Sequence, residues 1–82
     1  MVTATKRILR KGGTLRIFLG CDVGGERLGI HRKSNHHRPE AESLVKTGHL
    51  HLTRFDGMYH WFALTEAGKA LLRPIEARYA RL

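Results

Sequence analysis

The sequence predicts a small α+β domain whose elements follow the order α-β-β-α-β-β-α. Three observations support this fold class. The chain has 82 residues, which suffices for one core, so residues 1–82 are taken as a single domain. Residues 38–73 contain a helical pattern, a tight-turn signal and a second helical pattern. Residues 14–32 contain two short stretches in which apolar and polar residues alternate.

The N-terminal part of the chain predicts a short helix over residues 3–11 and then a β-hairpin. In residues 14–20 and 27–32, apolar side chains recur at every second position, which is typical of strands with one buried face. Residues 21–26 would form the turn between these strands. The side chains expected to point inwards are Leu15, Ile17, Leu19, Leu28 and Ile30.

A second helix is predicted over residues 39–47. Proline suits the first turn of a helix, because its missing N–H would be unpaired there, and Pro39 occupies that place. Gly48 is expected to end the helix in a left-handed conformation. The apolar stripe of this helix would be Ala41, Leu44 and Val45.

A second hairpin is predicted around the turn signal Asp56-Gly57, with strands over residues 49–54 and 58–64. Thr65 then follows as the expected N-cap of the last helix. The apolar face of that helix would be Ala67, Leu71 and Leu72.

The turn of the second hairpin is compatible with two registers. A two-residue turn would pair Phe55 with Met58, whereas a three-residue loop would pair Arg54 with Met58. One step of register moves every side chain of a strand to the other face. The second register is preferred, because it leads apolar side chains of both strands towards the start of the last helix. The residues on that face would be Leu50, Leu52, Phe62 and Leu64.

In the preferred register Tyr59 and Trp61 lie on the outer face of the hairpin. Exposed aromatic rings can stack on nucleic-acid bases or bury against a partner chain. Alternatively, Pro74 kinks or restarts the last helix, and residues 74–82 form a tail helix that covers the two rings through Ile75 and Tyr79. We prefer this second interpretation.

The second half of the chain resembles a known family. Residues 44–72 combine a helix ending in Leu-Val-x-x-Gly, a hairpin, and the segment FALTEAG at residues 62–68, which starts a helix. This order is similar to the C-terminal half of winged helix-turn-helix DNA-binding domains. The resemblance implies a winged-helix-like fold, DNA binding and a role in transcription regulation. It also implies that the helix over residues 39–47 enters the major groove. The hairpin predicted at residues 14–32 departs from the family, which has helices there.

The charge of the chain points to the same class of ligand. Fifteen Lys and Arg residues against seven Asp and Glu give a formal net charge of +8. Such a charge attracts polyanions, and nucleic acid first among them. Residues 1–38 hold nine basic and two acidic residues, whereas residues 39–82 hold six and five. The positive charge therefore belongs mainly to the first half.

The densest basic run, HRKSNHHR at residues 31–38, precedes the N-terminus of a predicted helix, where backbone N–H groups favour phosphate. We expect this segment to bind the phosphates, with help from the first helix and from the hairpin tip. The outward Glu40 and Glu42 of the second helix would instead repel phosphates or form a solvated face. The predicted nucleic-acid contacts are Lys6, Arg10, Arg32, Lys33, Ser34, Asn35, His36, His37, Arg38, Ser43, Lys46 and Arg54.

Other kinds of site are not favoured by the sequence. Cys21 is the only cysteine, so neither an internal disulfide nor a cysteine-based zinc site is expected. The six histidines lack the grouping of a metal site, and the histidines near Arg32 lack the paired carboxylates of a nuclease. The glycines of residues 20–29 lack the spacing of a phosphate-binding loop, so no cofactor is expected.

These observations predict a non-enzymatic nucleic-acid-binding protein, with double-stranded DNA as the first candidate ligand. No apolar segment is long enough to span a membrane and no secretory signal is evident, so a cytoplasmic location is expected. The alternative is a protein-interaction module or inhibitor with the same fold, which would dock on an acidic partner or form a homodimer. Glu40 and Glu42 on the presumed reading helix are the feature that favours the alternative.

Overall fold

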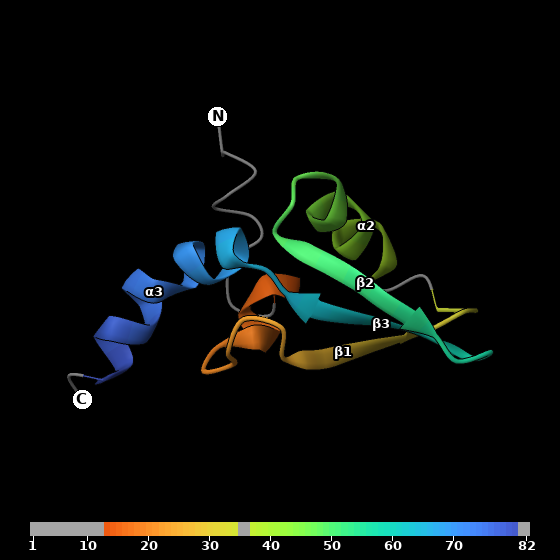
Figure 1. Cartoon of the computed structure of the whole chain (residues 1–82), viewed down its shortest axis with the longest axis horizontal. Coiled ribbons are helices and arrows are strands. Elements are labelled where there is room, and N and C mark those ends of the chain that lie inside the picture. Colours follow the sequence, from red (N-terminus) through yellow and green to blue (C-terminus); the bar gives the residue numbers. More distant parts are fainter. Residues whose placement is uncertain (1–12, 35–36, 81–82) are drawn as a thin grey trace.

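The computed structural model describes residues 13–34 and 37–80, and Figure 1 shows their arrangement. The helix predicted over residues 3–11 lies outside the described residues. The elements are the 3-10 helix η1 (Thr14–Phe18), strand β1 (Glu26–His31), helix α2 (Arg38–Lys46), strand β2 (Leu50–Phe55), strand β3 (Tyr59–Leu64) and helix α3 (Glu66–Ala80). The predicted α+β class is confirmed, whereas the predicted order of elements is only partly matched.

The three strands form one antiparallel sheet in the order β1-β3-β2. β3 is therefore central and contacts both other strands. Helix α2 packs along β2, while η1 lies where α2, β1 and α3 meet. The hairpin of β2 and β3 extends away from α3, so the hairpin tip and α3 occupy opposite ends of the molecule (Figure 1).

The strand predicted over residues 14–20 is wrong, because a 3-10 helix forms there. Leu15 and Phe18, three positions apart, are both fully buried, and one turn of 3-10 helix places them on the same side. Backbone N–H groups here donate to the carbonyl three positions earlier, as from Arg16 N to Gly13 O (3.1 Å) and from Cys21 N to Phe18 O (2.9 Å), so these groups need no strand partner. The first predicted hairpin is thus replaced by a helical turn leading into β1.

The second half of that predicted hairpin is confirmed as β1. Leu28 and Ile30 point into the core, at 8 % and 5 % exposure. Helix α2 also forms as predicted, with Ala41 and Leu44 buried and Val45 half-buried. Gly48 ends α2 with a φ of 83°, in the left-handed region that favours glycine.

In the second hairpin, the predicted face of each apolar side chain is confirmed, but the predicted pairing of Arg54 with Met58 is wrong. Leu50 lies opposite Leu64 and Leu52 opposite Phe62, so these four side chains share one face. A bulge then shifts the register, and Arg54 pairs with Trp61 rather than with Met58. The extra residue in β2 therefore turns Arg54 towards the outer face of the sheet.

Helix α3 begins at the N-cap predicted from the sequence. The Thr65 hydroxyl accepts a hydrogen bond from Gly68 N (3.2 Å) and donates one to Gly48 O (2.6 Å). Gly68 packs directly against the backbone of His49, so no larger residue fits without a shift. Leu72 is fully buried and Leu71 half-buried, but Ala67 is exposed and does not join the predicted apolar face.

Of the two alternatives predicted at Pro74, a kink or a restart, the restart as a separate tail helix is wrong. One helix runs from Glu66 through Pro74 to Ala80. Pro74 lacks the N–H that would bond to the preceding turn, yet the helix continues through it. Ile75 packs against the hydrophobic core, whose buried members are Leu15, Phe18, Cys21, Leu28, Ile30, Ala41, Leu44, Leu50, Phe62, Leu64 and Leu72.

Candidate nucleic-acid interface

The turn after β1 lies against the tip of the β2–β3 hairpin. Arg32 N donates a hydrogen bond of 2.7 Å to Met58 O, directly beyond the strand pair His31 and Tyr59. Arg38 at the start of α2 donates from Nη1 to Arg32 O over 3.4 Å. These two bonds therefore hold the three cations of one basic run, Arg32, Lys33 and Arg38, beside a hairpin tip that lies some twenty residues further along the chain. We call Arg32, Lys33, Ser34 and Arg38 the basic corner.

The cations of the basic corner are accessible. Arg32 and Lys33 are exposed, and neither side chain has an ion-pair partner among residues 13–34 and 37–80. Arg38 Nε contacts Glu42 Oε1 at 3.1 Å, with more than 40 % of each side chain exposed. Such an exposed pair is weak, so a phosphate can compete with Glu42 for the guanidinium group.

Two carboxylates of α2 are less repulsive towards phosphates than the sequence suggests. The predicted outward orientation of Glu40 is wrong: this residue is half-buried, and its Oε1 accepts a hydrogen bond from Thr14 N at 2.6 Å. Glu42 is paired with Arg38. Ser43 and Lys46, which were also predicted to contact nucleic acid, are exposed on the same helix.

The other predicted contacts have different environments. His37 is half-buried, and its Nδ1 lies 3.3 Å from Thr14 Oγ1, so its ring helps to join α2 to η1. Lys6, Arg10, Asn35 and His36 lie outside the described residues.

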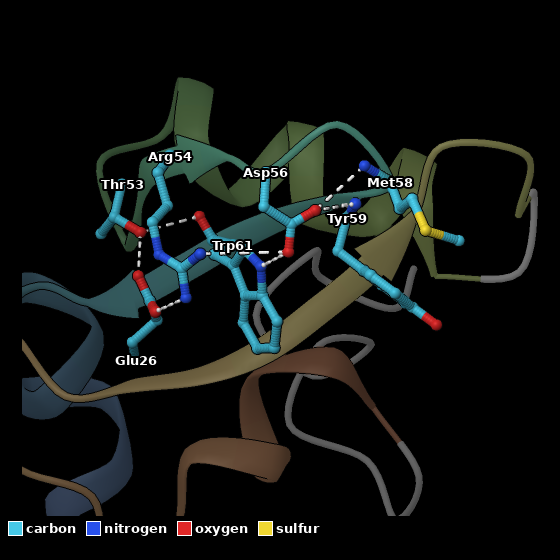
Figure 2. Close-up of polar contacts among 7 residues, drawn as sticks. All are labelled: Glu26, Thr53, Arg54, Asp56, Met58, Tyr59 and Trp61. Carbon is cyan, nitrogen blue, oxygen red and sulfur yellow. Dashed lines mark hydrogen bonds and ion pairs between the residues drawn. The ribbon is translucent and has the colours of Figure 1, made fainter.

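Arg54 was predicted to contact nucleic acid at the hairpin tip, but it is held within a network on the outer face of the sheet (Figure 2). Its Nη2 contacts Glu26 Oε1 at 2.9 Å, and its Nη1 lies 3.9 Å from Asp56 Oδ2. The guanidinium carbon also lies 4.8 Å from the centroid of the Trp61 ring, in a cation–π contact. Arg54 therefore serves first to join β2 to its neighbours.

Asp56 organises the hairpin tip by accepting three hydrogen bonds. Oδ2 accepts from Trp61 Nε1 at 2.8 Å, and Oδ1 accepts from Tyr59 N at 2.7 Å and from Met58 N at 3.0 Å. These bonds, above all the one from Trp61, lower the pKa of Asp56 from 3.8 to about 2. The carboxylate thus remains ionised at neutral pH with its oxygens already occupied.

Glu26 closes the other side of this network. Its carboxylate accepts a hydrogen bond from the Thr53 hydroxyl and pairs with Arg54. The Thr53 bond, followed by Arg54, lowers the pKa of Glu26, although desolvation opposes the shift. We call Glu26, Thr53, Arg54, Asp56 and Trp61 the outer-face network. This network is not predictable from the sequence, because no spacing signal links residues of β1, β2 and β3.

A close approach of two strands places the tryptophan of this network. An added Cβ at Gly29 would lie 2.8 Å from Trp61 Cζ3, so the indole rests on the glycine backbone of β1. The ring of Tyr59 lies 6.0 Å from that of Trp61 and 5.2 Å from that of His31. Tyr59 keeps 37 % exposure beside the basic corner.

The predicted cover of these rings by the tail helix does not form through Ile75. Ile75 packs against the core, and α3 lies at the other end of the molecule from the hairpin tip (Figure 1). The side chain of Tyr79 lies outside the described residues. The outer aromatic face therefore remains accessible near Tyr59.

Neither a metal site nor a membrane-spanning helix occurs within residues 13–34 and 37–80. There, no group of three or more His, Cys, Asp or Glu side chains is arranged to hold a metal ion. None of the helices in these segments has the length and apolar character needed to cross a membrane. Cys21 is buried, and its Sγ donates to Gly25 O over 3.5 Å.

Comparison with known proteins adds no relative. No protein-family model, no curated protein and no solved structure matches the chain.

Proposed function

We propose that this protein binds nucleic acid, double-stranded DNA in the first place, through the basic corner and the adjoining hairpin tip. The observation that carries the proposal is the hydrogen bond from Arg32 N to Met58 O, because it joins the densest basic segment to the exposed end of the sheet. Arg32, Lys33 and Arg38 would contact phosphates, and Ser34 would add a neutral polar contact.

Three further features support this proposal. Lys46 and Ser43 extend the exposed polar surface along α2. Glu40 is engaged with Thr14, which removes one carboxylate from that surface. Tyr59 offers a partly exposed ring beside the cations, and aromatic rings near basic groups suit contact with sugars or bases.

The proposal includes a winged-helix-like mode of docking. A helix followed by a hairpin and a second helix, with a sheet in the order β1-β3-β2, is consistent with that family resemblance. In this mode α2 faces the major groove and the hairpin contacts the adjacent backbone. The proposal also holds that the protein is not an enzyme and has a regulatory role. It would act in the cytoplasm, where the buried Cys21 thiol stays reduced.

Fluorescence anisotropy with a short labelled duplex at several salt concentrations tests this function. Binding should weaken steeply with salt, because released counterions drive it. The double variant Arg32→Gln/Lys33→Gln should reduce the slope of log affinity against log salt by about 2, since each phosphate contact contributes about one unit.

The matched control is Arg73→Gln/Arg78→Gln, which removes the same charge from exposed positions on α3, far from the hairpin tip. This control should leave the slope unchanged. Absence of binding by the unaltered protein, or equal loss in both double variants, would overturn the proposed interface. The same titration with single-stranded DNA and with RNA identifies the preferred ligand.

A second candidate function is protein interaction. Leu52, Phe55 and Met58 are large apolar residues of the hairpin with 42 %, 51 % and 54 % exposure. Exposed apolar side chains gathered on one element favour burial against another chain, either an acidic partner or a second copy. Sedimentation velocity over a concentration series tests the homodimer form of this function: a dimer that Phe55→Ser/Met58→Ser dissociates supports it, and a monomer throughout removes it.

A further inference from the structure

A groove lies between α2 and the sheet, on the opposite face from the outer-face network. Its volume is about 320 Å³, which falls at the lower end of the range of about 300–1,000 Å³ for small-molecule sites. The lining residues are Ile30, Arg38, Glu42, Val45, Lys46, Leu52, His60 and Phe62.

The floor of the groove is the part of the core face that α2 does not cover. Helix α2 has nine residues, and the sheet continues past it towards the hairpin tip. Along β2, Leu50 is 2 % exposed, whereas Leu52 on the same face is 42 % exposed. Apolar carbon that would normally be buried is therefore open to a ligand between α2 and β2.

The rim of the groove is positively charged. Arg38, Glu42 and Lys46 follow one another at four-residue spacing, so they form one ridge of α2. Glu42 pairs with Arg38. Lys46 forms neither an ion pair nor a hydrogen bond through its side chain within the described segments. The ridge thus presents two cations against one carboxylate, and its unmatched charge is that of Lys46.

Two aromatic rings, those of His60 and Phe62, line the groove. The ring of His60 stacks on that of Phe55, with centroids 4.5 Å apart and planes inclined by 28°. His60 also faces Ile30 of β1 across the sheet. A planar or branched apolar body in the groove can therefore contact both aliphatic carbon and the rings of His60 and Phe62.

We propose that this groove binds a small amphipathic anion, a compact aromatic or branched hydrocarbon carrying one carboxylate or sulfonate. The apolar body lies on Val45, Leu52 and Phe62, and the anionic head contacts Lys46. The charge of the ridge selects an anion over a cation, and the volume selects a small molecule over a longer lipid chain. The groove shares Arg38 and Lys46 with the proposed nucleic-acid surface, but its apolar lining lies outside that surface, so binding of a small anion there does not depend on the proposed nucleic-acid function.

Two fluorescent dyes of similar shape test the site in the whole chain. Anilinonaphthalene sulfonate carries a negative charge, and N-phenylnaphthylamine is neutral. Both should bind with saturation at one molecule per chain, because both have an apolar body that fits the floor. Lys46→Gln should weaken binding of the anionic dye by about two- to fivefold, the range for exposed charge pairs, and leave the neutral dye unchanged.

Leu52→Glu should weaken both dyes, because it places a carboxylate on the floor. The matched controls are Val23→Glu, which alters an exposed apolar residue outside the groove, and Arg73→Gln, which removes an exposed cation of α3. Neither should change the affinity for either dye. Near-ultraviolet circular dichroism of each variant confirms that the comparison is made on folded protein.

Three outcomes would overturn the proposal. The first is dye binding that neither Lys46→Gln nor Leu52→Glu affects, and the second is an equal loss in the controls. The third is sedimentation showing that the unaltered protein is a dimer which Leu52→Glu dissociates, because the groove would then be an interface between two copies. Since nucleic acid is absent from all these measurements, their failure does not bear on the basic corner.

Discussion

At the scale of single residues, Asp56 shows how one side chain shapes the hairpin. The backbone N–H groups of Met58 and Tyr59 and the indole N–H of Trp61 converge on this side chain. One carboxylate accepts all three. The aspartate side chain thus adds to the main-chain bond from Asp56 N to Tyr59 O (3.1 Å), which also closes the turn.

Asp56→Ala should therefore loosen the hairpin tip. The three donors lose their acceptor, and the Trp61 indole can turn away from Gly29. Because Trp61 is the only tryptophan, its emission should shift to longer wavelength, and the thermal midpoint should fall. Asp56→Asn, which keeps one carbonyl acceptor, should give an intermediate result. Unchanged emission in both variants would show that the indole is held by Gly29 and Arg54 alone.

At the scale of elements, side-chain bonds join α2 to η1. Glu40 accepts from the backbone N–H of Thr14, a residue that is fully buried, and His37 lies against the Thr14 hydroxyl. These contacts place the start of α2, and with it Arg38, relative to the core.

Glu40→Ala should destabilise the fold by about 1–3 kcal/mol, the cost of leaving a buried N–H without its acceptor. Glu42→Ala is the matched control, two positions further along the same helix, and it should cost no more than about 1 kcal/mol, as for other exposed pairs. Urea unfolding measures both. Equal effects would contradict the assigned role of Glu40.

Helix α3 gives a prediction with an unexpected sign. Replacing a helical glycine by alanine ordinarily stabilises a helix by up to about 1 kcal/mol. At Gly68, however, the added methyl group would meet the His49 carbonyl and Leu64 Cδ1. Gly68→Ala should therefore lower the free energy of unfolding by about 1–3 kcal/mol, the usual cost of overpacking.

Ala70→Ser on the exposed side of α3 should change this free energy by less than about 1 kcal/mol. A Gly68→Ala variant more stable than the unaltered protein would show that α3 does not need to pack so closely on residue 49.

At the scale of the whole molecule, stability should depend on pH through three carboxylates. The pKa of Asp56 is lowered to about 2, and hydrogen bonds lower those of Glu26 and Glu76, the latter mainly through Lys69. A lowered folded-state pKa stabilises the fold above the ordinary pKa, and this contribution is lost as the pH falls through the folded value.

Unfolding by urea should accordingly need less denaturant as the pH is lowered from about 5 to about 2. The Asp56→Asn variant should show a smaller loss between pH 3.8 and about 2, because it lacks the carboxylate that titrates there. A stability that is constant over the whole range would contradict the observed bonding of these groups.

The same scales explain what the sequence predicts and what it does not. Helix α2, both strands of the second hairpin and the Thr65 N-cap follow from local signals, because each is specified within a few residues. The 3-10 helix that contains Leu15 and Phe18 does not follow from local signals. Apolar residues there recur both at every second position and at a spacing of three, so the pattern fits a strand as well as a helical turn.

The sequence likewise predicts some features of the candidate site and not others. Arg32, Lys33 and Arg38 stand out as a basic run, but their position beside Met58 arises from strand pairing far along the chain. The bulge that turns Arg54 towards Glu26 and Trp61 has no signal of its own in β2. Long-range pairing therefore decides which cations are accessible and which are bound within the protein.

The hydrogen bond between Arg32 and Met58 has a consequence for how such a protein can change. It uses only main-chain atoms, N–H on one side and C=O on the other. The side chains at both positions can therefore vary without loss of that bond, with proline at position 32 as the exception, since it has no N–H. Ligand preference at this corner can thus evolve, or be screened in a library, largely independently of folding.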